Sequence, residues 1–187
     1  RLKFSDIELN FNENKKFFFN KNIQKLDAVW VRFLNGQSLE EITTKLTYLH
    51  LLSELNIYVH NSAITIEKTV DKVRTSGLLK INRILSPDTH IWISEKKKKI
   101  IKKDSLLKPI FGSQGKGIIL VKKNTNLSEM KSSGNVFYLQ NFVGEIRDQK
   151  FSDLRVLVSN HKVIASMERE SESFLTNVYQ GASYHRV

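Results

Sequence analysis

Apolar and polar residues alternate along this chain with spacings that predict both strands and helices. Residues 26–33 (LDAVWVRF) are almost continuously apolar, which predicts a buried strand. A helix is expected from Ser38, because Ser38-Leu-Glu-Glu41 has capping-box spacing and apolar residues then recur at helical intervals. Residues 57–59 predict a second strand. Strand, helix and strand at this spacing indicate a βαβ unit, and therefore an α/β fold with parallel strands.

The rest of the chain predicts one long helix and then a series of strands. The helical pattern covers residues 63–80. Further strands are expected at 90–94, in the residues leading to Lys108, at 118–121 and at 136–142. Residues 153–159 and 162–167 predict an antiparallel hairpin whose turn is Asn160-His161.

Composition narrows the classes of protein that fit this pattern. The 187 residues, 40% of them apolar, suffice for one large domain or two small ones. No run of about 18 apolar residues predicts a membrane span, and no secretory signal opens the chain, so a cytoplasmic protein is expected. The missing starting Met suggests that the chain begins inside a longer gene product. The absence of cysteine excludes disulfides and thiolate sites, and the five histidines lack metal-ligand spacing.

The formal net charge of +11 is compatible with a nucleic acid, an anionic membrane face or a phosphorylated ligand as partner. The lysines do not form a recognition helix with interleaved aromatic residues, so nucleic acid is not favoured. The densest run, Lys96 to Lys99, is expected in an exposed connection.

A glycine-rich segment, Gly112-Ser-Gln-Gly-Lys-Gly117, lies between two predicted strands. It fits neither the P-loop pattern nor the dinucleotide fingerprint, which needs a helix directly after it. Glycines nevertheless let backbone N–H groups approach a phosphate closely. A tight structural hairpin is the alternative. Lys108, at the end of the preceding strand, is well placed to reach phosphates.

An ordered series of motifs extends this phosphate hypothesis. In chain order they are VHNS, VDKVRTSGLL, PDT, LLKPIFGSQGKGIILV, YLQNFV, DLRVLV, VIASMERE and FLTNVYQGA. The series strongly resembles the ATP-grasp superfamily and, within it, the RimK-like glutamate ligases, over about residues 27–182. The resemblance implies an α/β protein with a small pre-ATP-grasp domain (1–62) and an incomplete ATP-grasp domain (63–187). It also implies a lid subdomain over about residues 104–140.

The resemblance implies an ATP site and assigns residues to it. The nucleotide-binding residues would be Lys72, Lys108, Gly112, Ser113, Gln114, Gly115, Gly117, Gln140, Asn141, Phe142, Val143, Asp153 and Asn177. The two lysines would contact phosphates and the glycine-rich segment would act as a mobile lid. Asn141 and Val143 would contact adenine through their backbones. Asp153 would lie near the ribose or orient Arg155, and Asn177 would lie near the triphosphate.

The resemblance also implies a reaction. ATP phosphorylates a carboxylate, and an amine attacks the acylphosphate to give an amide. Arg155 and Arg169 would be the catalytic residues, neutralising the transferred phosphoryl group or holding a substrate carboxylate. The expected partners are ATP, an amino acid such as glutamate and a carboxylate-bearing acceptor, which Arg32 would face; the acceptor's identity cannot be read from the sequence. Such ligases commonly associate, so a homo-oligomer is also an expectation.

One departure from the family concerns the metal. Its acidic Mg²⁺ ligands, an Asp and a Glu-x-Asn, are expected after Val187, so no metal ligand is assigned in this chain, and Glu168 and Glu170 do not occupy those positions. The chain is therefore interpreted as a fragment or a truncated relative. A non-catalytic nucleotide-binding or scaffold protein of ATP-grasp fold is the alternative function.

Overall fold

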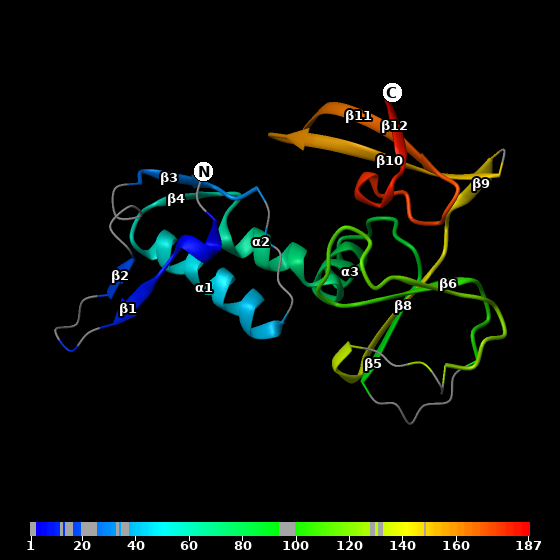
Figure 1. Ribbon diagram of the computed structural model, residues 1–187, viewed down its shortest axis with the longest axis horizontal. Coiled ribbons are helices and arrows are strands. Elements are labelled where there is room, and N and C mark those ends of the chain that lie inside the picture. The colour runs from blue at the N-terminus through cyan, green and yellow to red at the C-terminus, as the bar shows by residue number, and fades with distance from the viewer. Residues whose placement is uncertain are drawn as a thin grey trace. The chain divides into compact units, whose positions relative to one another are not determined.

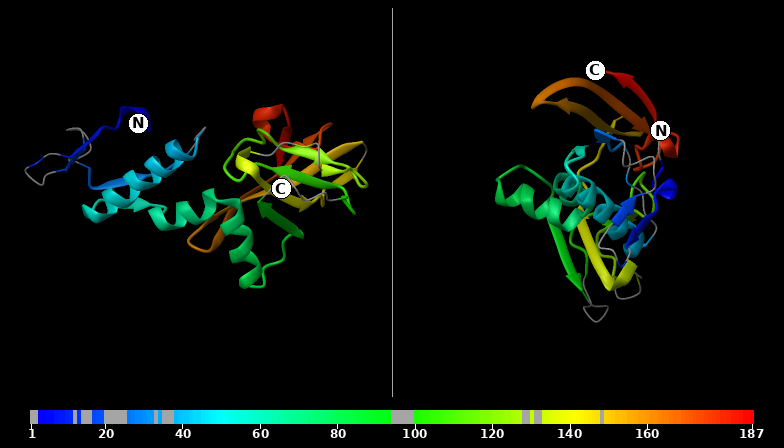
Figure 2. Two further views of the ribbon diagram at one scale, coloured as in Figure 1. Left: turned by 90° about the horizontal axis from the view of Figure 1, so that it is seen from below. Right: turned by 90° about the vertical axis from the view of Figure 1, so that its left-hand side faces the viewer.

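The computed structural model describes residues 3–11, 13, 17–19, 26–32, 34, 38–93, 100–127, 130, 133–147 and 149–187. The chain forms two compact units, an N-terminal unit (Arg1–Asp71) and a C-terminal unit (Lys72–Val187). Figures 1 and 2 show their elements in chain order. The predicted pre-ATP-grasp domain and lid subdomain stay predictions.

The N-terminal unit contains the predicted βαβ arrangement. Strands β3 (Ala28–Trp30) and β4 (Tyr58–His60) pair in parallel, and helix α1 (Leu39–Glu54) connects them. The Ser38 hydroxyl accepts a hydrogen bond from the Glu41 N–H at 3.1 Å, so the predicted start of α1 is confirmed. The unit's other elements are η1 (Phe4–Asp6), the antiparallel strands β1 (Leu9–Phe11) and β2 (Phe17–Phe19), and α2 (Ala63–Val70).

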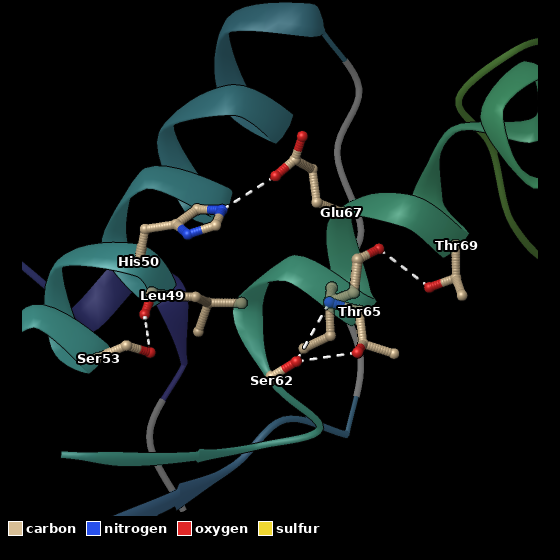
Figure 3. Close-up of polar contacts among 8 residues, drawn as sticks. Leu49, His50, Ser53, Ser62, Thr65, Glu67 and Thr69 are labelled. Atoms are coloured by element: carbon tan, nitrogen blue, oxygen red, sulfur yellow. Dashed lines mark hydrogen bonds and ion pairs between the residues drawn. The ribbon is translucent and has the colours of Figure 1, made fainter. Parts of the chain in front are cut away.

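The core of this unit lies between α1, α2 and one face of the two parallel strands. Its buried members are Leu49, Leu52, Ile57, Val59 and Ala63. Figure 3 shows His50 of α1 pointing toward Glu67 of α2, with 3.1 Å between His50 Nε2 and Glu67 Oε2. Ser62 caps α2 by accepting from the Thr65 N–H at 3.3 Å.

Two predictions for these segments were wrong in part. The strand expected over 26–33 is limited to β3, and its last residue, Phe33, lies outside the described residues. Only one face of β3 is covered, so Ala28 and Trp30 are exposed rather than buried. The single helix expected over 63–80 is two helices, α2 and α3 (Lys72–Ile81), because Asp71 adopts an extended conformation between them. Aspartate favours helix ends, since its side chain competes for nearby backbone groups.

The C-terminal unit contains two four-stranded antiparallel sheets, which Figures 1 and 2 show as separate layers. The first has the order β5 (Thr89–Ile93), β8 (Val136–Asn141), β6 (Ser105–Lys108) and β7 (Ile119–Val121). The second has the order β12 (Ser183–Arg186), β11 (Lys162–Ser171), β10 (Lys150–Ser159) and β9 (Glu145–Arg147). The described part of the unit also contains two short helical turns, η3 (Ser133–Asn135) and η4 (Val178–Gln180).

Each sheet has a feature that positions the site. The core of the first sheet is Ile101, Leu107, Val121, Leu127, Phe137 and Leu139, so its opposite face, with Leu106 and Lys108, is left for other contacts. In the second sheet β10 and β11 form the predicted hairpin, with Asn160 and His161 in the left-handed region at φ 46° and 60°. Strands β9 and β12 were not predicted.

Candidate functional site

A cavity of about 690 Å³ lies between the two sheets of the C-terminal unit. Its walls come from β6, β8, β10, β11 and the segment that precedes η4. Seven of the predicted nucleotide-binding residues line it: Lys108, Gln140, Asn141, Phe142, Val143, Asp153 and Asn177. The volume is within the range of sites for small molecules and cofactors.

Lys108 is a half-buried cation in the wall of this cavity. It ends β6, and its Nζ donates a hydrogen bond to Gln140 Oε1 at 2.7 Å. The Gln140 amide is fixed in turn, since its Nε2 donates to the Thr89 hydroxyl at 3.0 Å and to the Tyr138 hydroxyl at 3.2 Å. Burial lowers the pKa of Lys108. Among the described residues no carboxylate pairs with Lys108, so an anionic ligand would relieve an uncompensated, partly desolvated charge.

The linker after β8, residues 142–144, forms another part of the cavity wall. The backbone N–H groups of Asn141 and Phe142 donate to the carbonyls of Asp88 and Asp104, at 2.8 and 2.9 Å. Within the described part of the chain, the N–H of Val143 has no such partner, and this residue is 68% exposed. The Phe142 ring meets the Phe151 ring edge to face at 5.9 Å. The linker therefore offers a backbone donor beside aromatic surface, which suits a planar base.

The glycine-rich loop (Gly112–Gly117) packs against η4 and the residue before it. The carbonyl of Gln114 accepts a hydrogen bond from Gln180 Nε2 at 3.2 Å. Gly115 has φ +76°, and a Cβ added there would lie 2.7 Å from Asn177 Oδ1. Lys116 Nζ lies 5.4 Å from the centroid of the Tyr179 ring. Glycine is therefore required at 115 both for the backbone conformation and for the close approach.

Lys72 does not line the cavity. As the first residue of α3, it donates from Nζ to the carbonyls of Ile110 and Gly112, at 3.1 and 3.0 Å. It therefore ties α3 to the start of the glycine-rich loop.

Asp153 holds Arg169 in a bidentate ion pair across the hairpin. The distances are 2.7 Å from Arg169 Nε to Oδ1 and 2.5 Å from Nη2 to Oδ2, and Thr176 also donates to Oδ2 at 2.7 Å. Burial raises the pKa of Asp153, but the hydrogen bonds from Arg169 and Thr176, with the charges of Arg169 and Arg155, outweigh it and lower the pKa overall. The side chain that Asp153 orients is thus Arg169; Arg155 lies opposite Met167 and is exposed.

Eight predicted site residues lie outside the cavity wall: Lys72, Gly112, Ser113, Gln114, Gly115, Gly117, Arg155 and Arg169. Sequence reasoning missed much of the apolar wall: Leu106, Ile118, Phe151, Phe174 and Leu175. Strand alternation would have found Leu106, because it shares a face with Lys108. The described residues contain no group of three or more His, Cys, Asp or Glu that could hold a metal ion. None of the described helices has the length and apolar character needed to cross a membrane.

The fold with this cavity is that of an ATP-grasp protein. It is similar to the crystal structure of a RimK domain ATP-grasp protein from Sphaerobacter thermophilus, with a TM-score of 0.57 and 16% identity over 76% of this chain and 54% of that one. The RimK-like ATP-grasp domain family matches residues 69–187, and the chain belongs to this family.

Two relatives extend the similarity into the N-terminal unit. The tetrahydromethanopterin:alpha-L-glutamate ligase of Methanococcus maripaludis is 31% identical over 96% of this chain and 61% of its own length. The protein of the same name from Methanocaldococcus jannaschii is 32% identical over 95% of this chain and 63% of its own length. The chain thus spans about three fifths of the length of these relatives.

Proposed function

We propose that this chain is the nucleotide-binding part of an ATP-dependent ligase that joins glutamate, or another amino acid, to a carboxylate-bearing acceptor. The observation that carries the proposal is the half-buried Lys108, which pairs with no carboxylate among the described residues and lines the same cavity as Val143. A half-buried cation and a backbone donor at two places in one cavity suit a ligand with anionic and planar parts.

In this proposal ATP lies between the two sheets. The adenine contacts the backbones of Asn141 and Val143, beside Phe142 and Gln140. The phosphates extend to Lys108, and the glycine-rich loop covers them as the lid of a subdomain spanning about residues 104–140. Lys72, which bonds to the carbonyls of Ile110 and Gly112, positions that loop and exchanges these carbonyls for phosphate oxygens.

The distribution of charge supports an anionic ligand in the C-terminal unit. Residues 1–71 contain nine Lys or Arg and nine Asp or Glu, whereas residues 72–187 contain twenty-one and ten. The whole excess of +11 is therefore in the unit that contains the cavity. A positive unit attracts nucleotides and carboxylates and increases their encounter rate.

ATP supplies the phosphoryl group that turns the acceptor carboxylate into an acylphosphate, which the amine of the amino acid then attacks. Two arginines of the hairpin serve this step. Asp153 fixes the Nε–Nη2 edge of Arg169, so Nη1 is the part that would face a substrate. Arg155 is exposed and opposes the negative charge of the approaching carboxylate. The closed loop excludes water that would hydrolyse the acylphosphate.

The test uses the full-length protein with ATP, Mg²⁺, glutamate and tetrahydromethanopterin, the acceptor in the name of the two methanogen relatives. ADP release that requires both glutamate and acceptor is expected, and Lys108→Met should abolish it while the exposed Lys122→Met should not. ATP binding without ADP release, across a panel of carboxylate acceptors, would instead indicate a non-catalytic nucleotide-binding protein.

A further inference from the structure

The face of the first sheet that borders the cavity carries a network of polar side chains centred on Gln140. On this face Thr89 of β5 lies opposite Gln140 in the strand register, and Lys108 of β6 lies opposite Tyr138. Gln140 Oε1 accepts a hydrogen bond from Lys108 Nζ at 2.7 Å. Its Nε2 donates to the hydroxyls of Thr89 and Tyr138, at 3.0 and 3.2 Å. Side chains of β5, β6 and β8 therefore hold one amide group.

These partners fix which way round the amide stands. The Lys108 ammonium can only donate, so it must meet the amide oxygen and not the nitrogen. The Thr89 hydroxyl donates to the Pro87 carbonyl at 3.1 Å, so toward Gln140 it can only accept. The reversed amide would set its NH2 group against an ammonium and its oxygen against a hydroxyl without a free hydrogen, and each mismatch is unfavourable. Gln140 therefore has one favoured orientation.

Helix α3 completes the network behind Tyr138. The Tyr138 hydroxyl lies 2.6 Å from Ser76 Oγ of this helix. A tyrosine hydroxyl has a single hydrogen, so the hydroxyl that accepts from Gln140 gives its own hydrogen to Ser76. Tyr138 is only 3% exposed, and a buried network whose members are all paired is rigid. Both hydrogens of the Gln140 amide are thus used inside the protein.

What remains of Gln140 for a ligand is an acceptor. Gln140 lines the cavity, and its carbonyl oxygen has a second lone pair beside the one that Lys108 uses. A ring that meets this oxygen must donate a hydrogen. Adenine carries an exocyclic amino group at the ring position where guanine carries a carbonyl oxygen. An acceptor at Gln140 therefore favours the amino-substituted base.

We propose that Thr89 and Tyr138 are positioning residues, which hold the Gln140 amide with its oxygen toward the cavity and so make the nucleotide site select an amino-substituted base over a keto-substituted one. That the ligand is a nucleotide rests on the proposed function, whereas the orientation of the amide rests on its hydrogen bonds. Neither Thr89 nor Tyr138 lines the cavity, so each acts through Gln140. Without one of them, the amide is free to turn its NH2 group toward the base.

Tyr138→Phe and Thr89→Val each remove one acceptor of the Gln140 amide. Calorimetry measures the affinities of the full-length protein and of both variants for ATP and for GTP. The unchanged protein should bind ATP more tightly than GTP. Each variant should lower the ratio of the ATP affinity to the GTP affinity about ten-fold, because one matched donor–acceptor pair discriminates by about that factor or more. Tyr184→Phe and Thr125→Val make the same changes at two described residues that do not bond to Gln140, and they should leave the ratio unchanged.

A carboxylate at position 140 separates positioning from packing. Gln140→Glu puts an oxygen on both arms of the side chain, so there is no orientation left to hold. In this background Tyr138→Phe should no longer change the ratio of the two affinities. Loss of packing around the buried Tyr138 would, by contrast, weaken ATP and GTP binding by one common factor in either background. Circular dichroism and the melting temperature check that each variant folds.

Three results would overturn this inference while leaving the proposed function in place. The ratio of the ATP affinity to the GTP affinity could stay unchanged in both Tyr138→Phe and Thr89→Val. Tyr138→Phe could lower the ratio by the same factor in the Gln140→Glu background, or the unchanged protein could prefer GTP. Binding of neither nucleotide by the unchanged protein would contradict the proposed function itself, and the inference with it.

Discussion

Asp153 is a carboxylate with three donors, two from Arg169 and one from Thr176. Asp153→Asn should lower the free energy of unfolding by about 1–2 kcal/mol at pH 7, a figure reduced for the partial exposure of this ion pair. The folded-state pKa of Asp153 lies below its ordinary value of 3.8. Its contribution is therefore present at neutral pH and is lost as the pH falls through the folded-state pKa.

Urea unfolding of the unchanged protein and of Asp153→Asn, at pH 7 and at the lowest pH at which both are folded, measures this effect. The difference between their free energies of unfolding should be smaller at acid pH. Asp88→Asn, at a mostly exposed carboxylate, is the control and should stay within about 0.5 kcal/mol of the unchanged protein. A difference that does not depend on pH would show that the ion pair is not its source.

The affinity for ATP should depend on the charge of Lys108. Lys108→Met should weaken ATP binding by about ten- to hundred-fold, because a hydrogen bond to a charged group contributes about 1.5–3 kcal/mol. Burial places the pKa of Lys108 below its ordinary 10.5, so its charge is lost at a lower pH than that of a surface lysine. ATP affinity should therefore decrease as the pH rises through that pKa. Calorimetry across alkaline pH measures this decrease, which Lys108→Arg should remove.

At the scale of elements, the glycine-rich loop can be tested against a matched glycine. Gly115→Ala adds a Cβ at φ +76° and 2.7 Å from Asn177 Oδ1, whereas Gly134→Ala adds one at φ +61° with no atom within 4 Å. Both substitutions impose left-handed strain of about 1–2 kcal/mol, but only the first displaces Asn177. ATP affinity should fall for Gly115→Ala and not for Gly134→Ala. Equal affinities in the two variants would contradict a role for the contact between loop and Asn177.

Elements with local signals could be predicted from the sequence. Helix α1 carries its own cap at Ser38 and its own apolar stripe, and the β10–β11 hairpin carries its turn at Asn160 and His161. Strands β9 and β12 lie at the two edges of their sheet, and each pairs with a neighbour over only three or four residues. They form only when they can pair with β10 and β11, and the local sequence pattern does not indicate this pairing. The break at Asp71 was missed because the apolar spacing continues across it.

At the scale of the whole molecule, the ordered motifs predicted the family and much of the cavity. Lys108, Gln140 and Asp153, which line the cavity, could be named because each lies within one of these motifs. Ile118 and Phe174 were missed, since they line one cavity only when segments far apart in the chain fold together. The exposure of one face of β3 was also missed. The apolar run that contains β3 indicates burial of the whole strand, but it does not indicate that only one face is covered.

Charge is distributed unequally between the two units of the molecule. The N-terminal unit has no net charge, whereas the C-terminal unit has a net charge of +11, which favours an anionic ligand there. The proposed nucleotide site lies in the second of these units.

Calorimetric titration of this chain with ATP, beside Lys108→Met and Lys122→Met, tests whether the cavity between the two sheets binds the nucleotide. We expect saturable binding of one ATP per chain. Lys108→Met should weaken this binding, and Lys122→Met should leave it unchanged, because Lys122 is exposed and paired with Asp104. No binding of ATP, or equal binding by both variants, would contradict a nucleotide site in the cavity between the two sheets.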